Sequence, residues 1–321
     1  MSKSSTKALL NSVVVNDVKY LYKGKVITIE VEATAEEALE TLMKNHISSA
    51  PLLDNGKIVG VVDVKDFATA ILKVIGNQND QSPRLAHRSS GVDLRKNLAR
   101  KSLFSHLASK KITDTKRTTL LKTVKSGTPL VEVIGILANH GCHRVLVVDD
   151  GGAIVGLVTQ SAVLQYIHAH LDSCPELEKV LIGDNGIFQR RKIVTLSHDL
   201  TGKEAYEMML SSNVTAAPIL DKKGLILGNL SFSDLKGFGS KYSVESLMLP
   251  LPQFYNTVRK AFTSDTKFPC VYCGSKKPVA NVIRKLTSTR IHRIYVCKDF
   301  KPIGVLTLTS LMQILDALCK K

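Results

Sequence analysis

Two aspartates occupy the same place in a repeated motif and have the clearest capacity for chemistry. Asp66 lies six residues after Gly60, and Asp234 lies six residues after Gly228. A carboxylate can accept several hydrogen bonds, each worth about 1.5–3 kcal/mol, and the start of a helix stabilises its charge. The alternative is that both aspartates only cap helices. Two further copies of the motif lack the carboxylate at this offset and hold Ala162 and Ser310.

A second position of the motif lies three residues before the aspartate position, and it carries a hydroxyl group in three of the four copies. A hydroxyl can donate a hydrogen bond to a ligand oxygen, whereas an ionised aspartate cannot. The copy with Ser231 and Asp234 therefore carries both groups, and Asp63 places a second negative charge in the copy that contains Asp66. In chain order, this position holds Asp63, Thr159, Ser231 and Thr307.

Paired basic residues precede a strand in the two copies that lack the carboxylate. The pairs are His143–Arg144 and His292–Arg293. Arginine suits phosphate because its planar fork donates two parallel hydrogen bonds to phosphate oxygens. The alternative is a packed histidine beside a surface arginine.

The remaining motifs do not indicate catalysis or a metal. Cys270 and Cys273 have the spacing of metal ligands, but no second Cys-x-x-Cys pair occurs, and a structural zinc site needs about two more ligands. The chain has no His-Glu-x-x-His, no Gly-x-Ser-x-Gly and no kinase catalytic loop. We expect no catalytic residue, no metal, no cofactor and no enzymatic activity.

The elements that position these residues recur four times along the chain. Each copy is predicted to be a strand, a helix, two strands and a second helix, with the glycine in the last strand and the aspartate at the start of the last helix. Residues 34–37 and 201–204 have the pattern of capping boxes. Pro129 and Pro278 stand where a helix can begin without a backbone N–H.

The repeats predict an α/β fold built of α+β repeats, because one copy cannot bury its apolar face alone. The expected repeats span about 16–75, 100–172, 185–238 and 243–320. A basic connection at 76–116 separates the first two, and Ser173–Pro175 is the expected domain boundary. We therefore predict two domains, 1–175 and 176–321, with two repeats each.

Composition indicates a globular, strongly basic protein. The net charge is +16, and residues 84–125 hold twelve Lys or Arg against two Asp, a local net charge of +10. Such a segment attracts phosphates, acidic proteins or nucleic acid, although it also fits a solvated linker. Nucleic acid is the least favoured of these ligands, because single-stranded nucleic acid binds by stacking on aromatic side chains and the segment has one aromatic residue, Phe104. Six scattered cysteines indicate reduced thiols and thus the cytoplasm, or the nucleus as well. No run reaches the ~18 apolar residues that span a bilayer.

The repeat resembles the cystathionine-β-synthase (CBS) domain. Residues 227–234, 290–296 and 158–161 carry the resemblance most clearly. Four copies resemble two CBS pairs, or Bateman modules, as in the gamma subunit of AMP-activated and sucrose-non-fermenting-type protein kinases, with the plant type most similar. The resemblance implies a pseudo-symmetric disk that binds AMP, ADP or ATP. It also implies partners, a kinase catalytic (alpha) subunit and a scaffolding (beta) subunit.

The resemblance also assigns roles to individual residues. Two departures from the animal-type pattern, Gln160 in place of a histidine and Ser48 in place of a basic residue, weaken the expected site of the first pair. Ribose is assigned to Asp234, Ser231 and Asp66; phosphate to Arg293, His292, Arg144, His143 and Gln160; and adenine to backbone near Ala217, Pro218, Ala50 and Pro51.

Two other functions remain open on this sequence. The chain is either a CBS scaffold with degenerate sites, which binds protein partners without sensing nucleotide, or a regulator of a metabolic enzyme or transporter that binds an adenosyl ligand. Binding to a kinase catalytic subunit would distinguish the kinase subunit from the third possibility.

Overall fold

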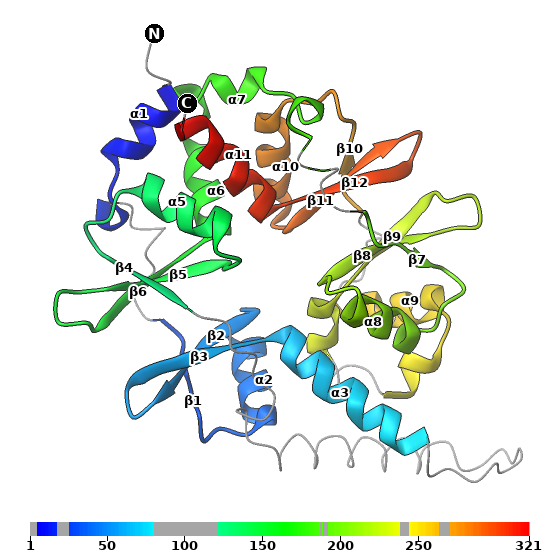
Figure 1. Ribbon diagram of the computed structural model, residues 1–321. Coiled ribbons are helices and arrows are strands. Elements are labelled where there is room, and N and C mark those ends of the chain that lie inside the picture. Colours follow the sequence, from blue (N-terminus) through cyan, green and yellow to red (C-terminus); the bar gives the residue numbers. More distant parts are fainter. Residues whose placement is uncertain are drawn as a thin grey trace, which may run out of the picture. The chain divides into compact units, whose positions relative to one another are not determined.

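The computed structural model describes residues 5–17, 26–79, 121–186, 188, 192–237, 244–262 and 270–320 (Figure 1). Most of the basic segment 84–125 lies outside these residues.

Within the described residues, the strands form four three-stranded sheets, one in each repeat. In each sheet the first strand is parallel to the second, and the second is antiparallel to the third. The parallel pair requires a crossover, which a helix supplies in every copy. The strands are β1 (Ile29–Glu30), β2 (Ser49–Asp54) and β3 (Lys57–Asp63); β4 (Lys122–Lys125), β5 (Arg144–Val148) and β6 (Ile154–Thr159); β7 (Leu196–Ser197), β8 (Ala216–Leu220) and β9 (Ile226–Ser231); and β10 (Tyr272–Cys273), β11 (Arg293–Lys298) and β12 (Lys301–Thr307).

The helices cover the sheets and join the repeats. The third repeat closes on a 3₁₀ helix, η6 (Phe232–Gly237), where the others close on an α-helix. Among the described residues, no helix combines the length and apolarity that a membrane crossing needs. The α-helices are α1 (Ser5–Ser12), α2 (Ala35–Lys44), α3 (Val64–Asn79), α5 (Leu130–Asn139), α6 (Gln160–Ala169), α7 (Glu176–Lys179), α8 (Gly202–Ser211), α9 (Leu251–Phe262), α10 (Val279–Thr289) and α11 (Leu308–Lys320), and the other 3₁₀ helices are η1 (Val15–Asp17), η3 (Leu171–Ser173), η4 (Gly183–Asn185) and η7 (Val244–Met248).

The chain folds into two compact units that interleave along the sequence. Unit 1 comprises Met1–Val26, Thr119–Ile193 and Cys270–Lys321, and unit 2 comprises Ile27–Thr118 and Val194–Pro269. Unit 1 thus contains the second and fourth repeats, and unit 2 contains the first and third. This grouping differs from the sequential pairs 1–175 and 176–321, which stay a prediction.

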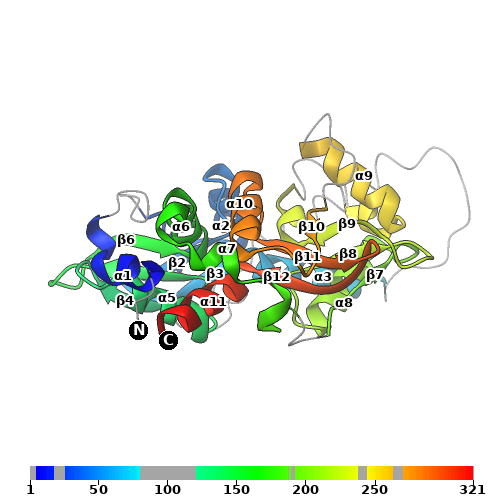
Figure 2. The same ribbon diagram turned by 90° about the horizontal axis from the view of Figure 1, so that it is seen from above.

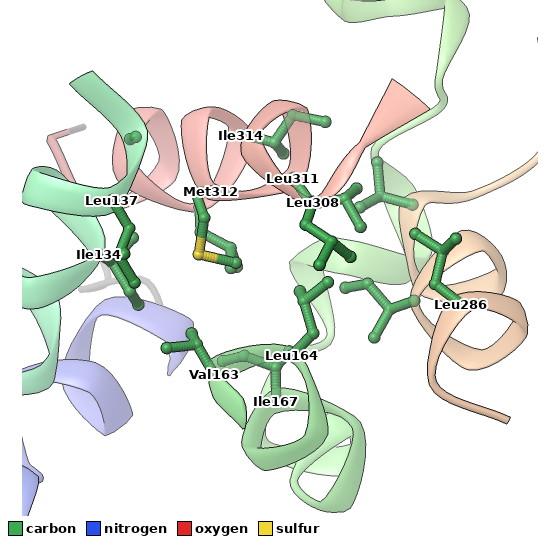
Figure 3. Close-up of a cluster of buried hydrophobic side chains, with 14 of the residues drawn as sticks. Ile134, Leu137, Val163, Leu164, Ile167, Leu286, Leu308, Leu311, Met312 and Ile314 are labelled. Atoms are coloured by element: carbon green, nitrogen blue, oxygen red, sulfur yellow. The ribbon is translucent and has the colours of Figure 1, made fainter. Parts of the chain in front are cut away.

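Unit 1 is built around helices that pack between its two sheets. α5 lies against α11, and α6 lies against α10 (Figures 1 and 2). Their facing side chains form one buried apolar cluster, which includes Ile134, Leu137, Val163, Leu164, Ile167, Leu286, Leu311 and Met312 (Figure 3). α1 is fastened to the same unit by Glu176, whose carboxylate accepts from the Ser5 amide at 2.7 Å and from the Thr6 hydroxyl at 2.6 Å.

Unit 2 has an aromatic core around α8. Tyr206 is fully buried, with its ring stacked on Phe232 at 5.7 Å and edge-on to Phe254 at 6.0 Å. Aromatic pairs of this geometry add roughly 0.5–1.5 kcal/mol beyond the burial of their area. These rings therefore hold α8, η6 and α9 together.

The repeated glycine follows a β-bulge in every copy. In the first repeat, Leu52 pairs with Gly60 and Leu53 pairs with Ile58, so Val59 is the extra residue. The other three sheets shift register at the equivalent place, just before Gly156, Gly228 and Gly304. A glycine inside a strand often marks a bulge, so this geometry gives a structural reason for the sequence spacing.

Both predicted capping boxes are confirmed. Thr34 caps α2, its hydroxyl accepting from the Glu37 amide while Glu37 accepts from the Thr34 amide at 2.8 Å. Thr201 and Glu204 form the same pair at the start of α8. Pro129 and Pro278 precede α5 and α10 as N-cap residues, one position earlier than the N1 site that favours proline.

The capping carboxylates should make stability depend on pH below neutrality. The backbone hydrogen bond from Thr34 lowers the pKa of Glu37 below its ordinary value of 4.5, and Thr201 lowers the pKa of Glu204 likewise. A depressed folded-state pKa gives stability that is present above the unfolded pKa and lost as the pH falls through the folded pKa. In urea melts between pH 6 and pH 3, the unfolding midpoint should therefore fall more steeply in the natural protein than in the Glu37→Gln, Glu204→Gln variant. Glu40→Gln, at an exposed position of α2, is the control and should keep the natural slope; equal slopes in all three proteins would contradict the prediction.

Candidate functional site

Asp66 and Asp234 lie at equivalent junctions between a strand and a helix in unit 2. Oδ2 of Asp66 accepts from the backbone N–H of Asp63 at 2.9 Å. Oδ2 of Asp234 accepts from the backbone N–H of Ser231 at 2.8 Å and from its hydroxyl at 3.1 Å. The two aspartates are 3% and 8% exposed. Both therefore act as helix caps in the structure, and Ser231 supports Asp234.

The equivalent junctions of unit 1 carry neutral caps. The Thr159 hydroxyl accepts from the Ala162 amide at 3.1 Å at the start of α6. Thr307 and Ser310 exchange two bonds of 3.2 Å at the start of α11, where each backbone N–H donates to the other hydroxyl. A helix start carries a partial positive charge. At the two junctions of unit 2 a carboxylate offsets this charge, whereas the two caps of unit 1 are uncharged hydroxyls. Unit 1 is thus better suited to an anion, and unit 2 to a diol.

The predicted phosphate-binding residues all lie in unit 1. Arg144 begins β5 opposite Thr159, and Arg293 begins β11 opposite Thr307, so each arginine is the cross-strand neighbour of a neutral cap. The preceding histidines, His143 and His292, are exposed. The fold therefore places both basic pairs and both neutral caps in the same unit.

The side chain of Gln160 makes hydrogen bonds inside unit 1. It is 3% exposed, and its Nε2 donates to the Leu137 carbonyl at 3.1 Å and to the Thr309 hydroxyl at 3.0 Å. Its Oε1 lies 3.3 Å from Nδ1 of His143. These bonds tie α6 to α5 and α11, so a phosphate contact by Gln160 would have to replace a bond that satisfies a buried amide.

A small cavity adjoins one of the basic pairs. It has a volume of about 140 Å³, and Arg290 and His292 line it together with polar groups of α6 and α10. Arg290 is in the left-handed conformation with φ 53°, where the second repeat has Gly141 with φ 66°. Sequence reasoning did not assign Arg290 a role, although it opens the stretch that resembles the CBS domain. The lining residues are Ser161, Leu164, Gln165, Leu286, Thr287, Arg290, Ile291, His292 and Leu308.

Two lysines that sequence reasoning missed join the repeats of unit 2. Lys236 Nζ donates to the Ser48 hydroxyl at 3.0 Å, so the third repeat supplies a cation where Ser48 itself lacks one. Lys65, beside Asp66, donates to the Asn213 side chain at 2.6 Å. No local signal could reveal these pairs, because the partners lie 188 and 148 residues apart.

The residues expected near adenine are buried. Ala50 and Pro51 lie in β2, and Ala217 and Pro218 lie in β8. In both sheets this dipeptide pairs with the strand that leads to the capping aspartate.

The Cys-x-x-Cys pair has the chemistry of buried thiols. Burial raises the pKa of Cys270 to about 12 and that of Cys273 to about 11, so both are protonated at neutral pH. In the part of the chain that the structure describes, no group of three or more His, Cys, Asp or Glu side chains is placed to hold a metal ion.

Comparison with known proteins places these features in a family. The model of the CBS domain matches residues 15–73, 117–169, 186–240 and 264–317. Protein sds23 of Neosartorya fischeri is 24% identical over 290 residues, which cover 85% of this chain and 52% of the relative. Protein SDS23 of Pyricularia oryzae is 25% identical over 297 residues, which cover 88% of this chain and 54% of the relative. The chain thus spans about half the length of the curated relatives that it matches.

Two solved structures share the fold over nearly the whole chain. Protein MJ1225 from Methanocaldococcus jannaschii, described as a proposed archaeal homolog of g-AMPK, superposes with a TM-score of 0.64 at 15% identity and covers 92% of this chain and 99% of its own. An uncharacterized conserved protein from Pyrococcus horikoshii has a TM-score of 0.54 at 19% identity and covers 93% and 99%. At these identities the likeness concerns the fold alone. The four matched segments and the four mixed sheets together show that the chain belongs to the CBS domain family, as a regulatory protein with four CBS domains.

Proposed function

We propose that this chain is a non-catalytic regulatory subunit that binds adenine nucleotides. The observation that carries the proposal is the contrast between the capped junctions: carboxylates at both described junctions of unit 2, and neutral caps beside arginine and histidine at both in unit 1. Each unit by itself suits one part of a nucleotide: the carboxylates of unit 2 suit a ribose diol, and the arginines and helix starts of unit 1 suit an anionic phosphate.

The individual roles follow from the same contrast. Asp234, oriented by Ser231, is assigned to ribose, with Asp66 as its counterpart in the first repeat. Arg293 and His292, and the equivalent Arg144 and His143, are assigned to phosphate. AMP, ADP and ATP differ in the number of phosphates, so these basic residues would discriminate among them.

The regulated partner in this proposal is a protein kinase catalytic subunit, assembled with a scaffolding subunit as in energy-sensing kinases. The likeness of the fold to MJ1225 supports this assignment. A nucleotide regulates such a complex only if its affinity differs between two states of the complex, and that coupling is reciprocal.

Titration calorimetry of the purified chain with AMP, ADP and ATP tests nucleotide binding. We expect saturable heat with at least one of them, and competition among those that bind. The absence of heat and of competition for all three would reject the nucleotide role. Capture of a kinase catalytic subunit is a separate assay, and its failure would reject only the partner.

A second candidate function is a scaffold that binds proteins without sensing nucleotide. Gln160 favours it, because this residue is buried and hydrogen-bonded where the animal-type pattern has a histidine facing phosphate. In that case the calorimetry would show no heat while partner binding persists.

A further inference from the structure

One hairpin turn departs from the other three in a way that folding does not require. In the first repeat, Asn55 and Gly56 form the turn between β2 and β3, with φ of 49° and 75°. In the fourth repeat, Asp299 and Phe300 form the turn between β11 and β12, with φ of 49° and 59°. The register is the same in both hairpins, since Asp54 pairs with Lys57 and Lys298 pairs with Lys301.

Phe300 thus occupies a left-handed position that suits glycine. Turns of this type prefer Asn-Gly because a Cβ is unfavourable at positive φ. The other hairpins obey the preference, with Gly56 at φ 75°, Gly152 at φ 83° and Gly224 at φ 79°. Strain of this kind persists where the surrounding structure imposes it, and it clusters at functional sites.

Packing against the described residues leaves most of the Phe300 side chain uncovered. Phe300 is 62% exposed, and Tyr272, whose ring it meets edge-on at 5.7 Å, is 42% exposed. Ile303, the bulge residue of the same hairpin, is 40% exposed. We call these three exposed apolar residues, of β10 and of the β11–β12 hairpin, the aromatic hairpin.

The aromatic hairpin has basic neighbours. Lys298 and Lys301 flank the turn and are both exposed. Lys285 donates to the carbonyl of Tyr272 at 3.3 Å. Lys285 and Lys277 also line, with Cys273, Asn281 and Val282, a cavity of about 150 Å³. Asp299 is the single acidic residue within the turn.

We propose that the aromatic hairpin is a docking surface for an acidic peptide segment of a partner protein, anchored by one large apolar side chain. Exposed aromatic residues are typical anchors of interfaces, and nearby lysines select a partner of opposite charge and speed the encounter. The proposal is independent of nucleotide binding, because it uses none of the residues assigned to that role.

Fluorescence anisotropy tests the proposal on the full chain. The probe is a fluorescein-labelled peptide of Glu and Asp with a central Phe-Leu pair, and two matched probes replace Phe-Leu with Ser-Ser or the acids with Lys. We expect Phe300→Gly to raise the Kd of the first probe at least ~tenfold, as loss of an anchor does, without lowering the thermal midpoint, because glycine accepts the turn geometry. A Lys298→Glu, Lys301→Glu variant should weaken binding similarly.

Val59→Ser is the matched control. Val59 is the bulge residue of the equivalent hairpin in the first repeat and is 40% exposed, but its turn carries Asn-Gly. Its Kd should equal that of the natural chain. The proposal is overturned if Phe300→Gly binds the probe as tightly as the natural chain, if the Ser-Ser or Lys probe binds equally well, or if no probe binds. It is also overturned if sedimentation shows a dimer that Phe300→Gly abolishes, since the occupant would then be a second copy.

Discussion

Replacing Asp234 with alanine is expected to weaken adenine nucleotide binding by roughly tenfold or more, because one or two hydrogen bonds to a charged acceptor are lost. Titration calorimetry with whichever of AMP, ADP and ATP binds the natural chain measures the change. Asp66→Ala tests the equivalent junction of the first repeat, where Asp63 replaces the hydroxyl. We expect Asp66→Ala to cause a smaller loss of nucleotide affinity. The carboxylate of Asp63 disfavours a nearby phosphate, so this junction should contribute less to binding in the natural chain.

The design must separate binding from capping, because Asp234 also accepts from the amide and hydroxyl of Ser231. Thr201→Ala is the matched control: it removes the N-cap hydroxyl of α8 in the same unit, at a typical cost of about 0.5–2 kcal/mol of stability, but leaves Asp66 and Asp234 in place. It should keep nucleotide affinity within about twofold. If Asp234→Ala remains folded and binds as tightly as the natural chain, the ribose assignment is wrong.

Replacing Tyr206 with alanine is expected to destabilise unit 2 by about 3–5 kcal/mol, the usual cost of removing a buried aromatic ring. Tyr206 is fully buried between Phe232 and Phe254. Its hydroxyl donates to the Ser231 carbonyl at 3.2 Å, so the loss should also loosen the junction that holds Asp234. Urea unfolding followed by circular dichroism measures the change in the free energy of unfolding.

A second variant of Tyr206 and a surface control complete this test. Tyr206→Phe keeps the ring but removes the hydroxyl, and should cost about 1 kcal/mol, the net worth of one hydrogen bond. Met208→Ala, at an exposed position of the same helix, should change stability by less than about 0.5 kcal/mol. A loss in Tyr206→Ala no larger than that in Met208→Ala would contradict the central place of this ring in the core.

Much of the fold could be predicted because each repeat is specified locally. Each capping box, at Thr34 and at Thr201, involves only two residues that are three positions apart. The glycine in the third strand of each repeat marks a β-bulge, which is also a local feature of the backbone. The same locality placed Asp66 and Asp234 at the starts of helices, where the structure has them. Fourfold repetition made each of these signals visible more than once.

The pairs that join distant segments could not be predicted, because they carry no local signal. Gln160 bonds to Thr309, which lies 149 residues away, and Lys236 reaches Ser48 across 188 residues. Such partners are set by how the helices of different repeats pack, and many residues of either type would fit the sequence pattern equally well. The exposure of Phe300 could not be predicted from the sequence either, because an aromatic residue beside a strand normally has a buried side chain.

The sequence alone therefore determined the four repeats and two capping boxes, and it supplied the candidate residues for a diol or a phosphate, because these depend on spacing along one strand or helix. The tertiary structure alone decided that the second and fourth repeats share one core and the first and third another. It also decided that Asp66 and Asp234 fall in unit 2 and the basic pairs in unit 1. The reason is that burial of apolar helix faces is not directional. Each repeat presents such a face, and the sequence pattern does not say which copy will cover it.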